Sequence, residues 1–413
     1  MHYDKSVRLL GGIVLDFLDL VERIDEIELL FEPIYSADGH SIDAYKLITY
    51  IDNQRIRLEE FSAEEDVPED IRAEMDQTIL RKALKLAKPH LHDVNLHIPC
   101  NPTLLMLDYG EGYFNMLKEE LDEEQLSRIV LVILEHQYRG DIKQLHHVIK
   151  YIKTYGVQIS LSRVGAHSNL NKILLLEPNI LNLHVRDMDY NEWGEQNYIF
   201  TALRTLALKI GASLMVSGIE TLYQFQHGWK NGVHYYKGPH FALPLTNFVE
   251  RNSLKEKFQA ECKEFIVTEQ KLAHKKFDAL KELENEIVEA IEKHHPSSAN
   301  MEALMALAIE IQTFAFRLYI CDEEGFQTTP NIISQDGKWH TQKEAMNKNW
   351  SWRPYFLLNL MKLRYNHEGR FSSPYSDIET GELTRTFSFA LSDNEYLFMD
   401  LSYSYLYEQN IIN

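Results

Sequence analysis

The stretch Leu29–Ile51 reads LLFEPIYSADGHSIDAYKLITYI and has the pattern of two strands joined by a turn. Apolar residues dominate Leu29–Tyr35 and Ile42–Ile51, and Asp38-Gly39 between them favours a tight turn. These two segments are therefore predicted to pair as an antiparallel hairpin. The chain after this hairpin follows another pattern, in which short apolar segments alternate with helical ones.

Six further strands are predicted downstream of the hairpin, at Val94–Ile98, Ile129–Leu134, Val157–Leu161, Ile180–His184, Ser213–Ser217 and His234–Tyr236. Helical periodicity separates them, at Ile142–Tyr155, Tyr198–Ile210 and Thr221–Trp229. Strands that alternate with helices imply a parallel sheet with helical crossovers. About eight strands then predict an α/β TIM-like (β/α)8 barrel over residues 28–246, with one antiparallel strand near its start.

Three other regions flank this barrel. Apolar residues spaced along residues 6–24 predict an N-terminal helix within 1–27. Residues 247–297 contain no glycine or proline before Pro296, which predicts one long connecting helix. Its apolar residues are expected either to pack on both flanking domains or to form a dimer interface, and the two interpretations are compatible. Residues 298–413 show the mixed helices and strands of a smaller α+β domain.

Composition excludes several classes of partner. The net charge of −20 disfavours binding to DNA or to an anionic membrane, because both need a basic surface. The sequence has no apolar run of about 18 residues and no signal-peptide pattern. Its three cysteines are dispersed, which suits a reducing compartment and argues against a disulfide framework. We therefore expect a cytoplasmic protein.

Several short motifs follow one another in a recognisable order along the barrel segments. They are Pro33-Ile34, Asp38-Gly39, Leu134-Glu135-His136, Val164-Gly165, Gly218-Ile219-Glu220-Thr221 and Tyr236-Lys237-Gly238-Pro239. This order resembles the EAL domain, the cyclic-di-GMP phosphodiesterase family. The tail resembles the PAS/Cache-like C-terminal domain of the bacillar YkuI type. That second resemblance is carried by Cys321–Gly325, Asn349–Phe356, Tyr375-Ser376-Asp377 and Tyr403–Gln409.

The resemblance also shows where this sequence departs from the family. The family's Glu-Ala-Leu motif follows a tyrosine that Tyr45 matches, so Lys46 replaces a metal-binding glutamate and Tyr50 replaces a ligand-binding arginine. At the other pocket positions, Pro99 replaces a metal-binding asparagine, Val132 replaces a glutamate, and Ser162 and Arg163 replace two aspartates. Asn182 replaces the catalytic lysine, Ser217 replaces a glutamate and Lys237 replaces a glutamine. Positions that the family uses to organise its structure are retained, at Glu135, Gly165, Gly218 and Glu220.

These replacements remove the chemistry that the family name implies. Two-metal phosphodiester hydrolysis needs hard oxygen ligands, and Mg²⁺ is usually held through carboxylates. The matched positions offer apolar, neutral or cationic side chains instead, so we expect neither a metal cofactor nor catalysis. Lys46, Arg163 and Lys237 are candidate anion contacts. The alternative is that they form salt bridges with barrel acids such as Glu135 or Glu220.

The resulting hypothesis is a catalytically inactive signalling protein that acts through protein contact, as a homodimer with an unknown protein partner. One alternative is a receptor that binds cyclic-di-GMP without hydrolysing it, and another is a weak or divergent phosphodiesterase. In the tail, Trp352, Arg353, Tyr355 and Asp377 are candidates to line a pocket for a small zwitterion or carboxylate. The alternative there is a structural ion pair between Arg353 and Asp377.

Overall fold

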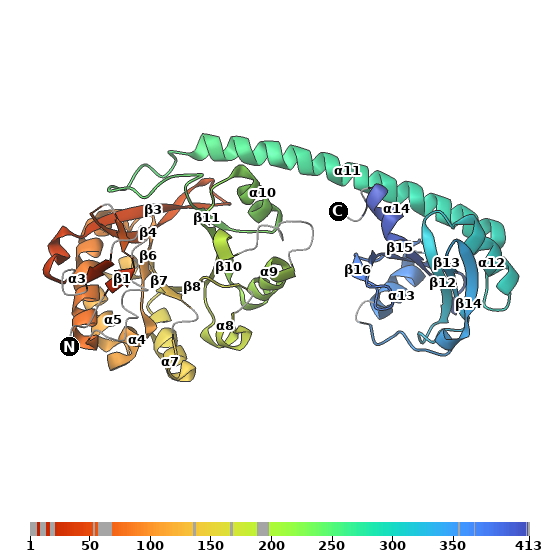
Figure 1. Cartoon of the computed structure of the whole chain (residues 1–413), viewed down its shortest axis with the longest axis horizontal. Coiled ribbons are helices and arrows are strands. Elements are labelled where there is room, and N and C mark those ends of the chain that lie inside the picture. The colour runs from red at the N-terminus through yellow and green to blue at the C-terminus, as the bar shows by residue number, and fades with distance from the viewer. Residues whose placement is uncertain are drawn as a thin grey trace. The chain divides into compact units, whose positions relative to one another are not determined.

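The structure is a computed structural model that describes residues 6–8, 14–16, 21–52, 54–56, 68–134, 138–165, 168–187, 198–353, 356–366, 368–409 and 411. Glu135 and Tyr355, two residues that the sequence singles out, lie outside this part of the chain. Contacts divide the chain into two compact units, Met1–Phe265 and Ile266–Asn413 (Figure 1).

The first unit contains a closed barrel of eight strands. They are β3 (Glu28–Ser36), β4 (Ser41–Ile51), β6 (Asn95–Pro99), β7 (Ile129–Leu134), β8 (Gln158–Ser162), β9 (Ile180–His184), β10 (Ser213–Ser217) and β11 (Tyr235–Lys237). The sheet closes because β3 pairs with both β4 and β11. It runs antiparallel to each of them, and the other neighbouring pairs in the ring are parallel. The predicted barrel with one antiparallel strand is confirmed.

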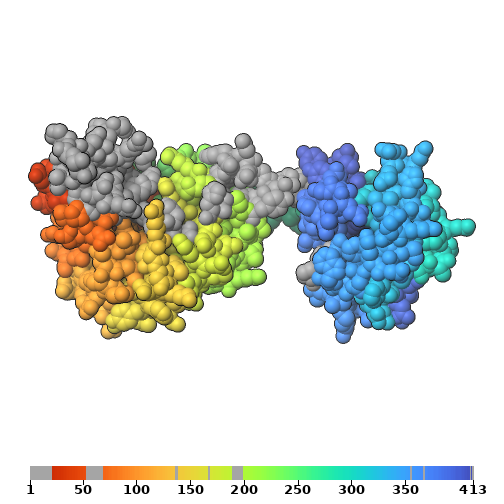
Figure 2. All heavy atoms as spheres, turned by 60° about the horizontal axis from the view of Figure 1, so that its bottom comes forward, coloured from red at the N-terminus to blue at the C-terminus, as the bar shows by residue number. Residues whose placement is uncertain are grey.

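Helices cover the outside of this barrel. Those within the described residues are α3 (Glu69–Ala87), α4 (Pro102–Leu105), α5 (Glu111–Glu120), α6 (Glu123–Leu126), α7 (Ile142–Lys153), α8 (Leu170–Leu176), α9 (Tyr198–Ile210) and α10 (Leu222–Lys230). Every residue of β7 is buried, as expected for a parallel strand packed on both faces. In Figure 2, the orange-to-yellow part of the chain, which includes α3 to α8, lies on the face that is shown.

The N-terminal helix expected within residues 1–27 is wrong at Ser6–Arg8 and Val14–Asp16, which are strands, whereas Val21-Glu22 are helical and Ile24–Glu26 form a 3-10 turn. Strand β1 (Ser6–Arg8) pairs antiparallel with β2 (Val14–Asp16), with Val7 opposite Leu15. Gly11-Gly12 stands between these strands in the sequence and disfavours a continuous helix. β-branched valines at 7 and 14 favour extended backbone, and this preference prevails over the helical spacing of the apolar residues.

The long helix is α11 (Lys255–His294), which has 40 residues and begins eight residues after the predicted start at 247. Near its first end, Phe258 and Cys262 are buried in the core of the barrel unit. Near its last end, Leu283, Ile287 and Ile291 are buried in the core of the second unit. No helix among the described residues has the length and apolar character needed to cross a bilayer.

The second unit is built on an antiparallel sheet of six strands in the order β14-β13-β12-β19-β18-β15. Their bounds are β12 (Ala315–Asp322), β13 (Asn331–Gln335), β14 (Lys338–Gln342), β15 (Arg370–Phe371), β18 (Thr386–Ala390) and β19 (Glu395–Leu401). A smaller sheet pairs β16 (Tyr375–Ser376) with β17 (Leu383–Thr384).

Helices pack on both faces of the larger sheet. On one face, α11 and α12 (Met301–Glu310) cover Leu318, Ile320 and Leu397. On the other, α13 (Phe356–Asn366) packs against Tyr319 and Phe398, which alternate with the first set along β12 and β19. The short helix α14 (Tyr403–Glu408) follows β19. This is the α+β arrangement that the sequence predicts for the tail.

Candidate functional site

The barrel interior has an apolar layer and, two residues further along the strands, a polar one. Ile34, Ala44, Val130, Ile180 and Met215 form the apolar cluster. Side chains two residues apart on a strand share a face, so the next inward positions toward the carboxyl ends of the parallel strands follow directly. These positions define the polar layer, whose described members include Glu32, Lys46, Asn182, Ser217 and Lys237.

A buried ion pair lies in this polar layer. The Nζ atom of Lys237 donates to Oε2 of Glu32 at 2.5 Å, and the side chains are only 6% and 9% exposed. Lys46, which is buried, stands opposite Glu32 in the antiparallel β3–β4 register. The layer therefore contains two lysines and one carboxylate among its described residues, which leaves an excess of positive charge.

His97 extends this layer, because it stands opposite Lys46 in the parallel β4–β6 register. Burial, and then the charges of Lys46 and Lys237, lower the pKa of His97 to about 3. The imidazole is therefore neutral at pH 7. Among the described residues, its Nδ1 has no hydrogen-bond partner, and neither do Oγ of Ser160 nor Oδ1 of Asn182. Since buried polar atoms are normally paired, these three atoms leave hydrogen-bonding capacity inside the barrel.

Five of the strand-end positions are neutral, namely Pro99, Val132, Ser162, Asn182 and Ser217. Asn182 Nδ2 donates to Ser162 Oγ at 3.0 Å, and Ser217 Oγ donates to the Leu183 carbonyl at 3.1 Å. Pro99 and Val132 are buried and have no side-chain oxygen. Ser162, Asn182 and Ser217 therefore make hydrogen bonds to neighbouring strands.

A pair of divalent cations does not fit this set of residues. No group of three histidine, cysteine or acidic side chains among the described residues is arranged to hold a metal. The two lysines of the polar layer would also repel a cation. We therefore derive no reaction step that involves a metal.

Two more expected pocket residues lie at strand ends. Arg163 directly follows β8, is partly buried and has a φ of +58°, a left-handed conformation uncommon for a residue with a Cβ. Tyr50 lies near the end of β4, opposite Glu28 of β3, and is also partly buried. Of the three candidate anion contacts, Lys46 and Lys237 both act on His97, whereas the structure does not place Arg163 in that group.

Most retained positions have local structural roles. Gly218 has a φ of +79°, and a Cβ there would lie 2.7 Å from the His184 ring, so glycine is needed. Glu220 is exposed and lies 3.5 Å from Arg186. The Gly165 amide donates to Ser168 Oγ at 3.0 Å. One of the candidate anion contacts forms a salt bridge with a barrel acid, since Lys237 binds Glu32.

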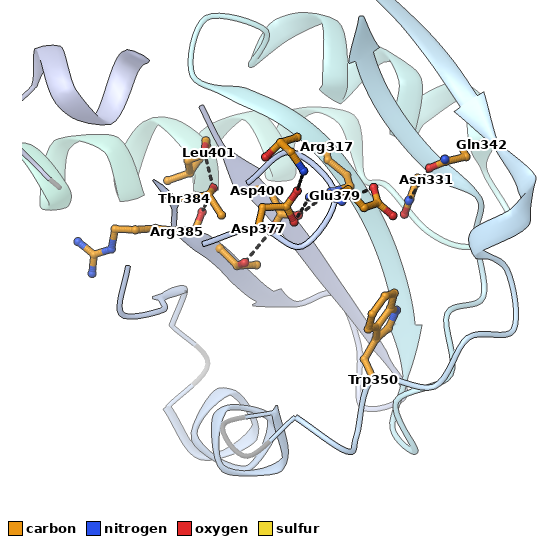
Figure 3. A network of polar contacts seen from close by, with 12 residues as sticks. Arg317, Asn331, Gln342, Trp350, Asp377, Glu379, Thr384, Arg385, Asp400 and Leu401 are labelled. Atoms are coloured by element: carbon orange, nitrogen blue, oxygen red, sulfur yellow. Dashed lines mark hydrogen bonds and ion pairs between the residues drawn. The ribbon is translucent and has the colours of Figure 1, made fainter. Parts of the chain in front are cut away.

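In the second unit, Asp377 binds a residue that the sequence analysis does not single out. Figure 3 shows Asp377, Glu379 and Asp400 converging on Arg317. The guanidinium donates to them at 2.7, 2.8 and 2.8 Å, respectively. Burial opposes the charge on Arg317, but Asp400 and Asp377 raise its pKa above the usual value. Burial likewise opposes ionisation of Asp377, and Arg317 outweighs it and lowers the Asp377 pKa.

Of the candidate tail-pocket residues, Asp377 binds Arg317, Arg353 lies against two tryptophan rings, and Tyr355 is outside the described part of the chain. The Arg353 guanidinium lies over the rings of Trp350 and Trp352, 4.5 and 5.8 Å from their centroids. Trp352 is 66% exposed, and Trp350 lies apart from the Arg317 network in Figure 3. The structural ion pair of Asp377 is therefore with Arg317. In the sequence, Arg317 stands alone among the apolar residues of Ala315–Cys321, and this pattern could have predicted a buried arginine with an acidic partner.

Comparisons with known proteins agree with this architecture. The EAL domain model matches residues 17–244, and a model described as an EAL-domain associated signalling protein domain matches residues 248–412. The uncharacterized EAL-domain containing protein YkuI of Bacillus subtilis (strain 168) is 37% identical over 404 residues, 96% of this chain and 99% of that protein.

One solved structure matches nearly the whole chain. The crystal structure of Bacillus subtilis YkuI, in complex with the substrate c-di-GMP and calcium, covers 97% of this chain and 100% of that chain, with a TM-score of 0.89 and 37% identity. A standalone EAL protein from Vibrio cholerae O395, in a c-di-GMP-bound form, is 22% identical and covers 56% of this chain and 97% of that chain, with a TM-score of 0.48.

Proposed function

This chain belongs to the EAL-domain family, and on that premise we propose that it is a regulatory protein that does not hydrolyse cyclic-di-GMP. The observation that carries the proposal is the polar layer of the barrel, where the Lys237–Glu32 ion pair lies next to Lys46. In a metal-dependent phosphodiesterase, this region would have to collect carboxylates around two cations.

Electrostatics explains why the layer disfavours metal. Two like unit charges 4 Å apart repel by about 4 kcal/mol at an effective dielectric constant near 20. Glu32, the carboxylate described in the layer, is already bound to Lys237. A divalent cation would have to displace that ammonium and also tolerate Lys46. The neutral residues Ser162, Asn182 and Ser217 offer poor compensation, because Mg²⁺ usually requires carboxylate ligands.

Protein contact is the proposed output, with a protein partner and within a homodimer that α11 would form. The middle of α11 exposes Ile266, Val267, Leu272 and Phe277, with exposed fractions from 40% to 67%. Both ends of the helix are packed into cores, so this segment is the part that remains available for a partner helix. A cytoplasmic location belongs to the same proposal, because Cys100, Cys262 and Cys321 are all buried and free.

A hydrolysis assay tests the loss of catalysis. The full chain is incubated with cyclic-di-GMP and Mg²⁺, Mn²⁺ or Ca²⁺, and the products are separated by chromatography. We expect no linear dinucleotide above the protein-free control, and no metal-dependent rise in the melting temperature. Turnover that disappears in the Glu135→Ala variant would refute the proposal, because it would show chemistry that depends on the family's framework.

Binding of intact cyclic-di-GMP is a second candidate function. It is favoured by the crystallised relative, which is 37% identical and is in complex with c-di-GMP and calcium. The excess positive charge of the polar layer would also suit phosphate oxygens. Calorimetric titration with and without calcium tests this candidate. Absence of binding at about 100 μM, weaker than about −5.5 kcal/mol, would exclude it.

A further inference from the structure

Helix α13 of the second unit is apolar on both of its faces. Its inner residues Phe356, Leu360 and Leu363 are no more than 4% exposed and pack against the sheet. Its outer apolar residues are Leu357, Leu358, Met361 and Tyr365, with exposed fractions of 57%, 58%, 53% and 84%. A helix that is apolar all round is normally buried on all sides, so the outer face needs an explanation.

The outer residues form one continuous surface, which we call the α13 stripe (Leu357, Leu358, Met361 and Tyr365). At about 100° per residue, these positions fall within an arc of roughly 100° on the helix. The 11 residues of α13 span about 16 Å. Leu358 and Met361 are three residues apart and Met361 and Tyr365 are four apart, which are the spacings of side chains that contact a partner helix.

We propose that the α13 stripe binds an amphipathic helix of a partner protein, apolar on one face and acidic along its margins. The charge of the sequence around α13 favours a partner with acidic margins. Residues 345–367 contain four basic residues, Lys348, Arg353, Lys362 and Arg364, and no aspartate or glutamate. With 62 acidic residues in 413, a segment of 23 residues would be expected to contain about three. This region is therefore basic within an acidic chain.

The basic residues border the stripe. At 100° per residue, Lys362 follows one edge of the arc and Arg364 precedes the other. Lys362 is exposed, and Arg364 binds Glu323 at 2.8 Å and the Tyr396 hydroxyl. An acidic partner helix would meet Lys362 directly and could compete with Glu323 for Arg364. Such a contact supplies charge complementarity at the rim and apolar burial at the centre.

Two other occupants fit these observations less well. A second copy related by a two-fold axis would place the same basic margins against one another, since an isologous interface pairs a patch with itself. An anionic bilayer would attract the basic margins but repel a chain whose net charge is −20. The inference deepens the proposed output by protein contact, and it stands on α13 without involving the barrel.

The experiment uses the full chain and two synthetic helical peptides with the same leucine face, one with glutamate margins and one with lysine margins. Fluorescence anisotropy measures the dissociation constant of each labelled peptide. We expect the acidic peptide to bind in the micromolar range and at least tenfold more tightly than the basic one. Met361→Glu should weaken its binding at least tenfold, and Lys362→Glu should shift the preference toward the basic peptide.

Ile309→Glu is the matched control, because Ile309 is 52% exposed on α12 of the same unit, nearly the same as Met361. It should leave peptide binding unchanged. Leu358→Glu is the second stripe variant if Met361→Glu alters the circular dichroism spectrum. Because the hydrolysis assay is independent, failure of peptide binding would leave the proposed loss of catalysis standing.

Three results would overturn the inference. One is no binding of the acidic peptide at 100 μM, or equal binding by Met361→Glu. Another is a halved mass of Met361→Glu in light scattering, which would assign the stripe to a second copy of this chain. The third is sedimentation with anionic phosphatidylglycerol vesicles that Met361→Glu abolishes, which would assign it to a membrane.

Discussion

The barrel and the C-terminal unit each bury a cation, and they satisfy it in opposite ways. Arg317 of the C-terminal unit donates to three carboxylates at 2.7 to 2.8 Å. Lys237 of the barrel binds the single carboxylate of Glu32 and shares its layer with Lys46. The first network surrounds one arginine with three carboxylates. In the second, the described residues include two lysines, one carboxylate and three nearby polar atoms that have no hydrogen-bond partner within that part of the chain.

The chemistry of the two cations fits this difference. A guanidinium has five donors in a rigid planar fork, which can engage several carboxylates at once and hold strands together. An ammonium is a compact point charge that imposes less geometry on its surroundings. The Arg317 network is thus suited to fixing the sheet, while the polar layer of the barrel keeps capacity to accept an anion or a polar ligand.

Removing Arg317 should have the largest effect on stability. Arg317→Met leaves Asp377 and Asp400 buried without their cation, which should destabilise the C-terminal unit by about 3–5 kcal/mol. Calorimetry should show its unfolding transition at a markedly lower temperature. Arg364→Met, which removes an exposed arginine bound to Glu323, is the matched control and should leave the transition in place. Equal transitions in both variants would show that the Arg317 network is dispensable.

Lys237→Met should have the second-largest effect on stability. It removes the ammonium bound to the buried Glu32 carboxylate, at an expected cost of about 3 kcal/mol to the barrel unit. Glu32→Met combined with Lys237→Met should recover most of that loss, because both partners of the ion pair are then replaced by apolar side chains. Urea unfolding followed by circular dichroism measures both. If the double variant is as unstable as the single one, the layer depends on more than charge pairing.

Acid should destabilise the barrel through His97. Its pKa falls from 6.5 to about 3 on folding, so the unfolded chain binds the extra proton below pH 6.5. The barrel should therefore lose about 2–3 kcal/mol between pH 6.5 and 4.5, and this contribution should not vary above pH 6.5. Urea midpoints across this range should fall less steeply for His97→Gln. Parallel pH profiles for the two proteins would mean that His97 can become charged inside the barrel.

Phe277→Glu should have the smallest effect on stability, under about 0.5 kcal/mol, because Phe277 is 67% exposed. Its expected effect is on assembly. Light scattering should show a dimer for the wild type and the monomer mass of 48.4 kDa for this variant. Leu86→Glu, at an exposed leucine of α3, should remain dimeric. A monomeric wild type at micromolar concentration would contradict the dimer interface on α11.

The strands were predictable where apolar runs are short and bounded by turn signals. Ile129–Leu134, Ile180–His184 and Ser213–Ser217 were predicted with the bounds that β7, β9 and β10 have. The weakest prediction was at residues 6–24, where apolar spacing suggested a helix and Ser6–Arg8 forms a strand. Strands β13 and β14 were missed because their alternating polar residues resemble a loop.

The types of side chain at the strand ends could be predicted from the sequence, because residue type and place along a parallel strand fix which side chains meet inside a barrel. Ser162, Asn182 and Lys237 were identified in this way, and Lys46 was identified from the resemblance to the family's Glu-Ala-Leu motif. The ionic partners of these side chains could not be predicted from the sequence. Glu32 meets Lys237 across 205 residues only because β3 closes the barrel, and Asp377 meets Arg317 rather than Arg353 because β12 presents that arginine on the same face. Local patterns carry periodicity and charge, whereas the choice of ionic partner depends on which distant strands become neighbours.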